Sequence, residues 1–129
     1  MGTLNLERDT KVVLETYLSN YRLVAALAAK YGFDFGFFFQ PNIRAGAKRL
    51  TVEEEQIAAS GASDPSSPLV LAVHALAVGE KSLERLYYMG NLFDSRDDSI
   101  WIDPVHVTPD GNRLVAATIA RHITADNRR

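Results

Sequence analysis

A change in hydrophobic pattern at Gly32 constrains the fold more than any other feature of this sequence. Apolar side chains in residues 8–31 recur at spacings of three and four, which places them on one face of a helix. The members of this face are Val13, Tyr17, Tyr21, Val24, Leu27, Ala28 and Tyr31. Gly32 predicts the end of the helix, because glycine adopts the left-handed conformation without a Cβ clash. The next segment, 33–40, is short and aromatic and lacks the alternation of a half-exposed strand. Because helix, turn and buried strand form half of a repeating α/β unit, we expect an α/β fold with parallel strands.

The remainder of the chain predicts three more helices and one more short strand. A capping box and the pairing of serine with proline mark two helix starts, and Thr108-Pro109 marks a third. The expected elements are a helix from Thr51 to about Ser60, a helix from Ser67 to about Met89, a strand over 100–102 and a helix over 109–123. No internal repeat or interdomain linker is visible, so we expect residues 1–129 to form a single domain.

Composition narrows the classes of function. The net charge of -2 argues against a nucleic-acid partner, and no apolar run is long enough to span a bilayer. The absence of cysteine rules out a disulfide framework, a thiolate zinc site and a cysteine nucleophile. The three histidines lack the spacing of metal ligands, so no metal and no cofactor are expected. No secretory signal is visible at the start of the chain, which makes the cytoplasm the default compartment without establishing it.

The segment 100–112 contains the candidate catalytic residues of the sequence. A short strand delivers Asp103 at its carboxyl end, and Pro104 favours an extended conformation at Asp103. His106 follows in a turn ahead of a capped helix. A carboxylate three residues from an imidazole can accept its Nδ1 proton, which leaves Nε2 free as a general base. The alternative is a surface turn in which Asp103 only caps a local amide.

This segment resembles the last sequence block of the SGNH (GDSL) hydrolases, where the Asp and His of a catalytic triad lie three residues apart before a final helix. Gly111-Asn112 and the run from Phe37 through Glu54 add to the likeness, which is tight only over 100–119. The resemblance implies a three-layer α/β/α fold with a flavodoxin-like parallel sheet, incomplete at its N-terminal side. It also implies His106 as general base, Asp103 as its orienting partner, and a small-molecule ester substrate such as an acetylated sugar or a lipid.

Two family blocks are missing from the sequence. The nucleophilic serine of the family lies in a Gly-Asp-Ser block, and part of its oxyanion hole lies in a Gly-x-Asn-Asp block; neither is present. Gly61-Ala62-Ser63-Asp64 is the nearest serine context, but no predicted strand precedes it. We therefore expect the C-terminal portion of such an esterase, inactive alone, with self-association or a missing N-terminal segment covering its exposed apolar surface. The alternative is a non-catalytic remnant or binding module.

Other conspicuous residues have ordinary interpretations. His74 lies on an apolar helix, where packing is favoured over catalysis, and His122 lies near a helix C-terminus, where the dipole favours a cation. Trp101 fits a substrate pocket and a core position equally well. Thr51 and Glu54 are interpreted as a helix cap. Arg44, Lys48 and Arg49 belong to a polar loop in which exposure to solvent is favoured over contact with an anionic substrate.

Overall fold

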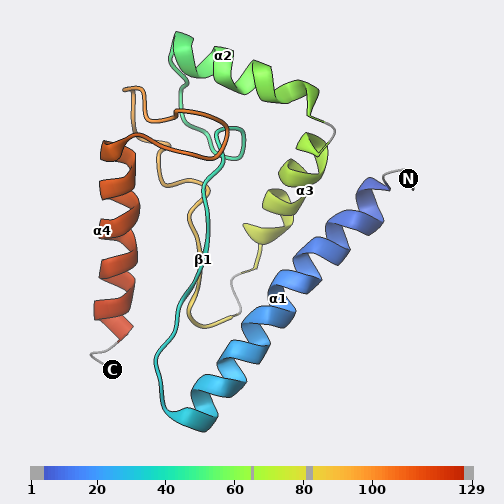
Figure 1. The fold of residues 1–129 in the computed structure, drawn as a ribbon, viewed down its shortest axis with the longest axis vertical. Coiled ribbons are helices and arrows are strands. Elements are labelled where there is room, and N and C mark those ends of the chain that lie inside the picture. The colour runs from blue at the N-terminus through green and yellow to red at the C-terminus, as the bar shows by residue number, and fades with distance from the viewer. Residues whose placement is uncertain (1–4, 65, 81–82, 127–129) are drawn as a thin grey trace.

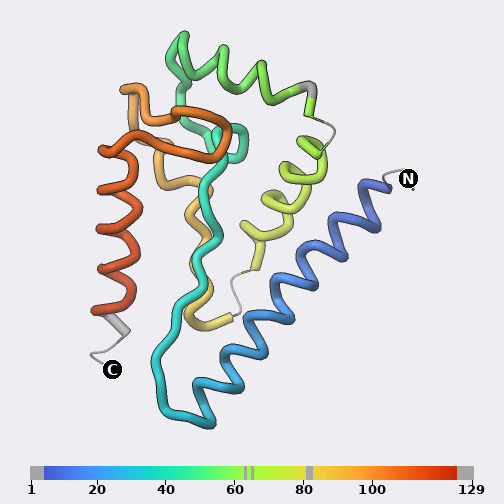
Figure 2. The backbone as a smooth tube through the Cα atoms, in the orientation of Figure 1, coloured from blue at the N-terminus to red at the C-terminus, as the bar shows by residue number. Residues whose placement is uncertain are grey.

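The computed structural model of the chain describes residues 5–64, 66–80 and 83–126, and within these ranges it contains four α-helices and two short strands (Figures 1 and 2). In chain order the elements are α1 (Leu6–Tyr31), β1 (Phe37–Phe39), α2 (Val52–Ser60), a single 3₁₀ turn η1 (Gly61–Ser63), α3 (Ser67–Ala77), β2 (Leu86–Tyr88) and α4 (Pro109–Asp126).

The ends of α1 confirm the predicted helix. The Asn5 side chain accepts a hydrogen bond from the Arg8 amide at the start, and Gly32 ends the helix with a φ of 71°. The predicted inner face is right for Tyr21 and Ala28, which are buried, but wrong for Val13, Leu27 and Tyr31, of which Tyr31 is 67% exposed. The reason is length, because a helix of 26 residues extends beyond strands of three residues and keeps contact with them only along its middle.

The two strands form a parallel sheet in which Phe37 pairs with Leu86 and Phe39 pairs with Tyr88. Because side chains alternate between the faces of a strand, Phe37 and Phe39 contact Tyr17 of α1, whereas Phe38 stacks on Tyr87 near α4. Figure 1 shows α1 and α3 on one side of the strands and α4 on the other. The predicted strand over 33–40 is therefore confirmed for residues 37–39, which have one parallel neighbour, and is wrong for the residues on either side.

The predicted three-layer α/β/α fold with a flavodoxin-like sheet is wrong. The described residues are mostly helical, and their sheet has only two strands, which are too few to form a layer. The candidate strand over 100–102 does not join this sheet; Trp101 forms an isolated antiparallel bridge with Val107 instead. The partner of Trp101 is thus only six residues further along the same chain, because the chain turns back on itself immediately after residue 102.

The predicted helix from Ser67 to Met89 is also wrong in its second half. Helix α3 ends at Ala77, and Leu86-Tyr87-Tyr88 is a strand. Aromatic side chains favour a strand, and here they pack against the aromatic side chains of β1. The pairing with β1, which is far away in the sequence, therefore favours the strand over the predicted helix.

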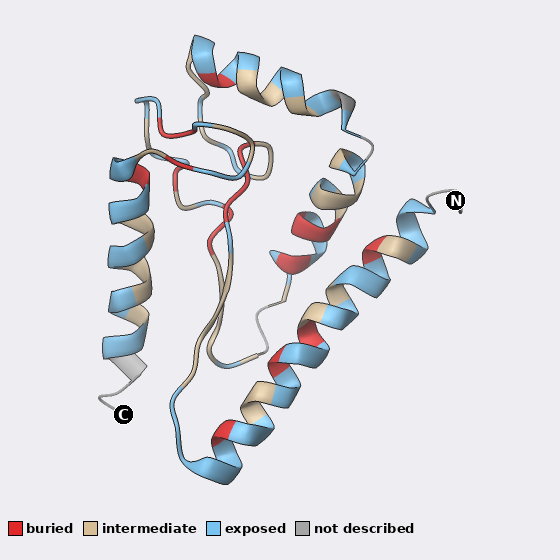
Figure 3. Ribbon diagram, viewed as in Figure 1, coloured by how far each residue is buried: buried red, intermediate tan, exposed pale blue. Residues whose placement is uncertain are grey.

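A cluster of buried apolar residues lies in the loops between α2 and the start of α4 (Figure 3). It consists of Ile43, Phe93, Ile100, Trp101 and Val107, all of them at most 9% exposed. Trp101 packs edge-on against Phe93 with ring centroids 5.4 Å apart. Trp101 is thus a core residue, which resolves its two interpretations. Because Ile100 and Val107 flank the Asp103–His106 segment, the core lies directly beneath it.

Candidate functional site

The site is built on a tight turn formed by residues 100–108, which we call the dyad turn. Its two arms are joined by hydrogen bonds from the Ile102 amide to the His106 carbonyl, 2.9 Å, and from the Thr108 amide to the Ile100 carbonyl, 2.7 Å. The Trp101–Val107 bridge lies between these bonds. The chain enters α4 directly from this turn, so the segment before the helix is held at both arms.

Asp103 and His106 lie together at the tip of the dyad turn. Oδ2 of Asp103 is 2.6 Å from Nδ1 of His106, while Oδ1 accepts the backbone N–H groups of Val105, 2.9 Å, and His106, 2.8 Å. The amide of Val105, the side chain of His106 and the amide of His106 lower the pKa of the Asp103 carboxyl to about 2. An ionised carboxylate can only accept hydrogen bonds, so Nδ1 carries the proton and Nε2 of the neutral ring is the free base.

Asp103 therefore does both things that the sequence left open: it caps local amides and it orients the imidazole. The His106 side chain is 75% exposed, which leaves its ring accessible to a reacting group. A dyad of this geometry can accept a proton at Nε2 and return it, with the carboxylate stabilising the imidazolium in between.

A cavity of about 160 Å³ adjoins the dyad turn. Pro104 and Val105 form one wall, and the loop after β1 and the start of α3 form the others. Two serines line this cavity, but Ser66 Oγ donates to Asp64 at 2.8 Å and Ser67 Oγ donates to the Gly61 carbonyl at 2.7 Å. Both hydroxyls are thus engaged in the structure of the loop rather than held against His106.

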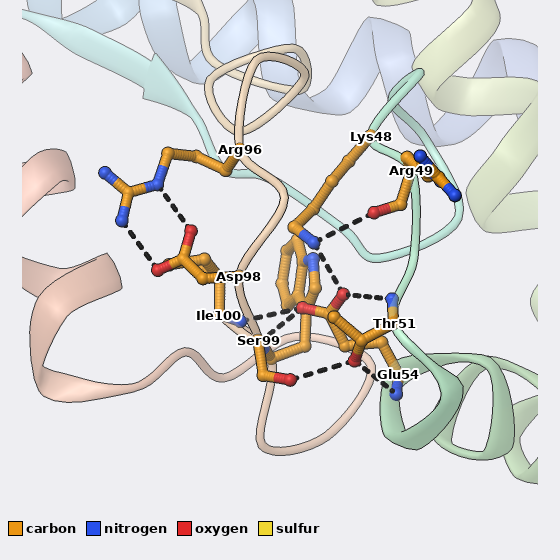
Figure 4. Close-up of polar contacts among 9 residues, drawn as sticks. Lys48, Arg49, Thr51, Glu54, Arg96, Asp98, Ser99 and Ile100 are labelled. Carbon is orange, nitrogen blue, oxygen red and sulfur yellow. Dashed lines mark hydrogen bonds and ion pairs between the residues drawn. The ribbon is translucent and has the colours of Figure 1, made fainter.

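Glu54 of α2 supports the dyad turn from beneath (Figure 4). Its side chain has no exposed surface, and its Oε1 accepts the amides of Ile100, 2.7 Å, and Trp101, 3.1 Å. Its Oε2 accepts Lys48 Nζ at 2.6 Å and the Thr51 amide at 3.0 Å. Burial raises the pKa of the Glu54 carboxyl, but the hydrogen bond from Lys48 and those from the three amides outweigh it and hold that pKa below its ordinary 4.5.

Two of the sequence interpretations at this place need correction. Thr51 and Glu54 do form the predicted capping box, but Glu54 is more than a cap, because its carboxylate reaches a segment 46 residues away. Lys48 does not lie in solvent; its side chain is 4% exposed and pairs with Glu54. Nothing local in the sequence marks either residue as buried, since a capping-box glutamate is normally at the surface.

Two further contacts fix the dyad turn to its surroundings. The Ile43 amide, in the loop after β1, donates to the Pro104 carbonyl at 3.1 Å. Gly111, in the first turn of α4, lies so close to the turn that a Cβ added there would be 2.7 Å from Cβ of Val107 and 2.9 Å from Cγ2 of Ile100. The absence of a side chain at residue 111 therefore lets α4 approach the turn.

The remaining histidines have packing roles. His74 is 6% exposed, lies edge-on against Phe39, and has Nδ1 3.1 Å from the hydroxyl of Tyr88; its burial lowers the pKa of the imidazole. His122 stacks on Tyr87 with ring centroids 4.0 Å apart. These contacts are all with residues outside the dyad turn. Within the part of the chain that it describes, the structure therefore brings together only the two site residues that the sequence predicted, Asp103 and His106.

Comparisons of this chain with known proteins find no matching family model, no matching curated sequence and no matching solved structure. Over the described ranges, no three His, Asp or Glu side chains are grouped so that they could hold a metal ion. None of the helices there has the length and apolar character that crossing a membrane requires.

Proposed function

We propose that this chain supplies the His106 and Asp103 of a serine esterase of the SGNH type, and that the nucleophilic serine comes from a polypeptide segment outside these 129 residues. The observation that carries the proposal is the 2.6 Å contact between Asp103 Oδ2 and His106 Nδ1, with the carboxylate anchored by two amides and the imidazole exposed. The resemblance of segment 100–119 to the last block of that family supports the same assignment.

The proposed reaction is hydrolysis of an acyl ester through a covalent acyl-enzyme. His106 Nε2 takes the serine proton as the hydroxyl attacks the ester carbonyl, and the imidazolium gives that proton to the departing alcohol. Water then attacks the acyl-serine, again with His106 as base, and releases the carboxylic acid. Asp103 holds the reactive tautomer throughout and stabilises the imidazolium; no cofactor takes part.

The experiment begins with the chain alone. It should not be labelled by a fluorophosphonate probe and should barely exceed the background hydrolysis of p-nitrophenyl acetate, because both the nucleophile and the oxyanion donors are missing. Joined to an upstream segment that bears the Gly-Asp-Ser and Gly-x-Asn-Asp blocks, it should gain labelling at that serine. Stoichiometric labelling of the chain alone would show that one of its own serines is the nucleophile, contrary to the proposal.

Variants of the joined protein test the two roles. His106→Ala should abolish turnover, and Asp103→Asn should lower kcat by roughly 10⁴-fold through loss of tautomer control. Asp110→Asn is the matched control, because this exposed carboxylate pairs with Arg113 in α4 and should leave kcat unchanged. Normal turnover in the His106→Ala protein would mean that the dyad turn is not the catalytic one, contrary to the proposal.

A further inference from the structure

A fully buried carboxylate, that of Glu54, lies beneath the exposed tip of the dyad turn. Glu54 has no exposed surface, yet its two oxygens receive four hydrogen bonds, and two of these come from the arm of the dyad turn that leads to Asp103. Figure 4 shows the carboxylate between Lys48 on one side and the Ile100 backbone on the other.

The geometry points to Glu54 as a positioning residue of the His106–Asp103 dyad, an inference that rests on the proposed function. The Glu54 carboxylate fixes the amides of Ile100 and Trp101, and the Ile100 carbonyl in turn accepts the Thr108 amide of the opposite arm. Both arms of the dyad turn are thereby held at their base, so the tip keeps Asp103 Oδ2 against His106 Nδ1.

The charge of Glu54 matters as well as its shape. All four of its partners are donors, so both atoms at the end of the side chain must be acceptors. In Glu54→Gln one of these atoms becomes an NH₂ donor, which must face either the amides of the dyad turn or Lys48 and Thr51. Even where the NH₂ faces Lys48 and Thr51, the neutral amide oxygen holds the Ile100 and Trp101 amides less strongly than a carboxylate oxygen does. We therefore expect the arm at Ile100 to shift and the Asp103–His106 contact at the tip to loosen with it.

Nuclear magnetic resonance of the isotope-labelled chain tests this without any need for catalysis. In the unchanged chain, ¹⁵N shifts should show His106 mainly as the Nδ1–H tautomer, and ¹³C titration should place the pKa of Asp103 at about 2. In Glu54→Gln the tautomer should move toward the Nε2–H form that free histidine prefers, and the pKa of Asp103 should rise toward its ordinary 3.8. Unchanged tautomer and titration in the folded variant would overturn the inference.

Two controls separate positioning from stability. Glu55→Gln removes an exposed carboxylate from the same turn of α2 and should change neither readout. Lys48→Met removes the partner charge but leaves the Glu54 carboxylate to hold the amides of Ile100 and Trp101. It should therefore destabilise the chain while His106 keeps its tautomer. Equal disturbance of the tautomer in Lys48→Met and Glu54→Gln would show that Glu54 acts through stability alone and would overturn the inference.

The unchanged chain provides a second measurement if Glu54→Gln does not fold. The Ile100 and Trp101 amides should show scalar coupling across the hydrogen bond to the Glu54 carboxyl carbon and slow exchange with solvent. Fast exchange with no such coupling would overturn the inference.

Turnover of the joined esterase distinguishes the two proposals. Glu54→Gln should lower kcat by about 10- to 100-fold with little change in KM, because misplacing a catalytic group affects the chemical step. If Glu54→Gln disturbs the dyad while turnover does not depend on His106, Glu54 positions the dyad but the esterase proposal fails. If turnover requires His106 and Glu54→Gln leaves kcat and the tautomer intact, the esterase proposal stands and the positioning role fails.

Discussion

Replacing Lys48 by Met should destabilise the chain strongly, because it breaks an ion pair that has almost no contact with solvent. The two side chains are 4% and 0% exposed, and Nζ lies 2.6 Å from Glu54 Oε2. Removing one partner of a buried pair costs about 3–5 kcal/mol, since the remaining charge stays desolvated. Three amide donors remain around the Glu54 carboxylate, so we expect the lower end of this range, about 3 kcal/mol.

A loss of about 3 kcal/mol is a large part of the total of about 5–15 kcal/mol that stabilises a typical domain. It lowers the equilibrium constant for folding by more than about 100-fold and, for a chain of 129 residues, the melting temperature by roughly 10–15 °C. Trp101 is the only tryptophan of the sequence and is 5% exposed, so urea denaturation followed by its fluorescence measures the change directly in the core beneath the dyad turn.

The control is Lys11→Met, which removes an exposed lysine paired with Glu7 one helical turn away. An exposed pair of this kind contributes about 0.3–0.5 kcal/mol, so this variant should melt almost as the unchanged chain does. If Lys48→Met also changes the free energy of unfolding by less than about 0.5 kcal/mol, Lys48 is not desolvated in solution and the reasoning is refuted.

Three other outcomes follow from the structure. Gly111→Ala should lower the free energy of unfolding by about 1–3 kcal/mol in the same urea assay, because the new Cβ overlaps Val107 and Ile100 and outweighs the gain in helix propensity; a stabilised variant would contradict this. Acid should also destabilise the chain: the folded-state pKa of Glu54 is lowered, so its contribution is complete above the unfolded value of about 4.5 and is lost as the pH falls through the folded value. The free energy of unfolding should depend less steeply on pH in a variant that lacks both Glu54 and Lys48. Equal slopes for this variant and the unchanged chain would contradict the assignment of the acid sensitivity to Glu54. Finally, the exposed apolar side chains of α1 should make the chain self-associate, and a monodisperse monomer in sedimentation at high concentration would refute this.

Local signals predicted the local structure well. Gly32 ends α1 in the left-handed conformation, and Thr51 with Glu54 forms the capping box that starts α2. Asp103 and His106 were also predicted to lie together before the last helix, because a spacing of three residues in a turn limits how far apart two side chains can be. Each of these features depends on residues within a few positions of one another, which is the range over which sequence pattern determines geometry.

Features that depend on distant contacts were not predictable in the same way. Residues 86–88 were expected to be helical, yet they form β2 because Tyr87 and Tyr88 stack on Phe38 and Phe39, far away in the sequence. The extent of the sheet was overestimated for the same reason, since a buried strand pattern does not say how many neighbours a strand has. Glu54 was recognised only by its near partner Thr51, whereas its partners at the dyad turn could be seen only in the fold.

The proposed role of Glu54 in positioning the dyad turn explains its burial better than a contribution to the stability of the fold does. A buried ion pair contributes little net stability, and replacing both partners with well-packed apolar residues is often neutral or favourable. An apolar side chain could fill the same space, but it could not accept the amides of Ile100 and Trp101, which would then have to find other partners by shifting the dyad turn. The proposed function requires Asp103 Oδ2 to stay 2.6 Å from His106 Nδ1, and such a shift would disturb this contact. A carboxylate accepts all four donors that converge on Glu54, and it thereby fixes the base of the dyad turn while the side chain of His106 at the tip stays exposed.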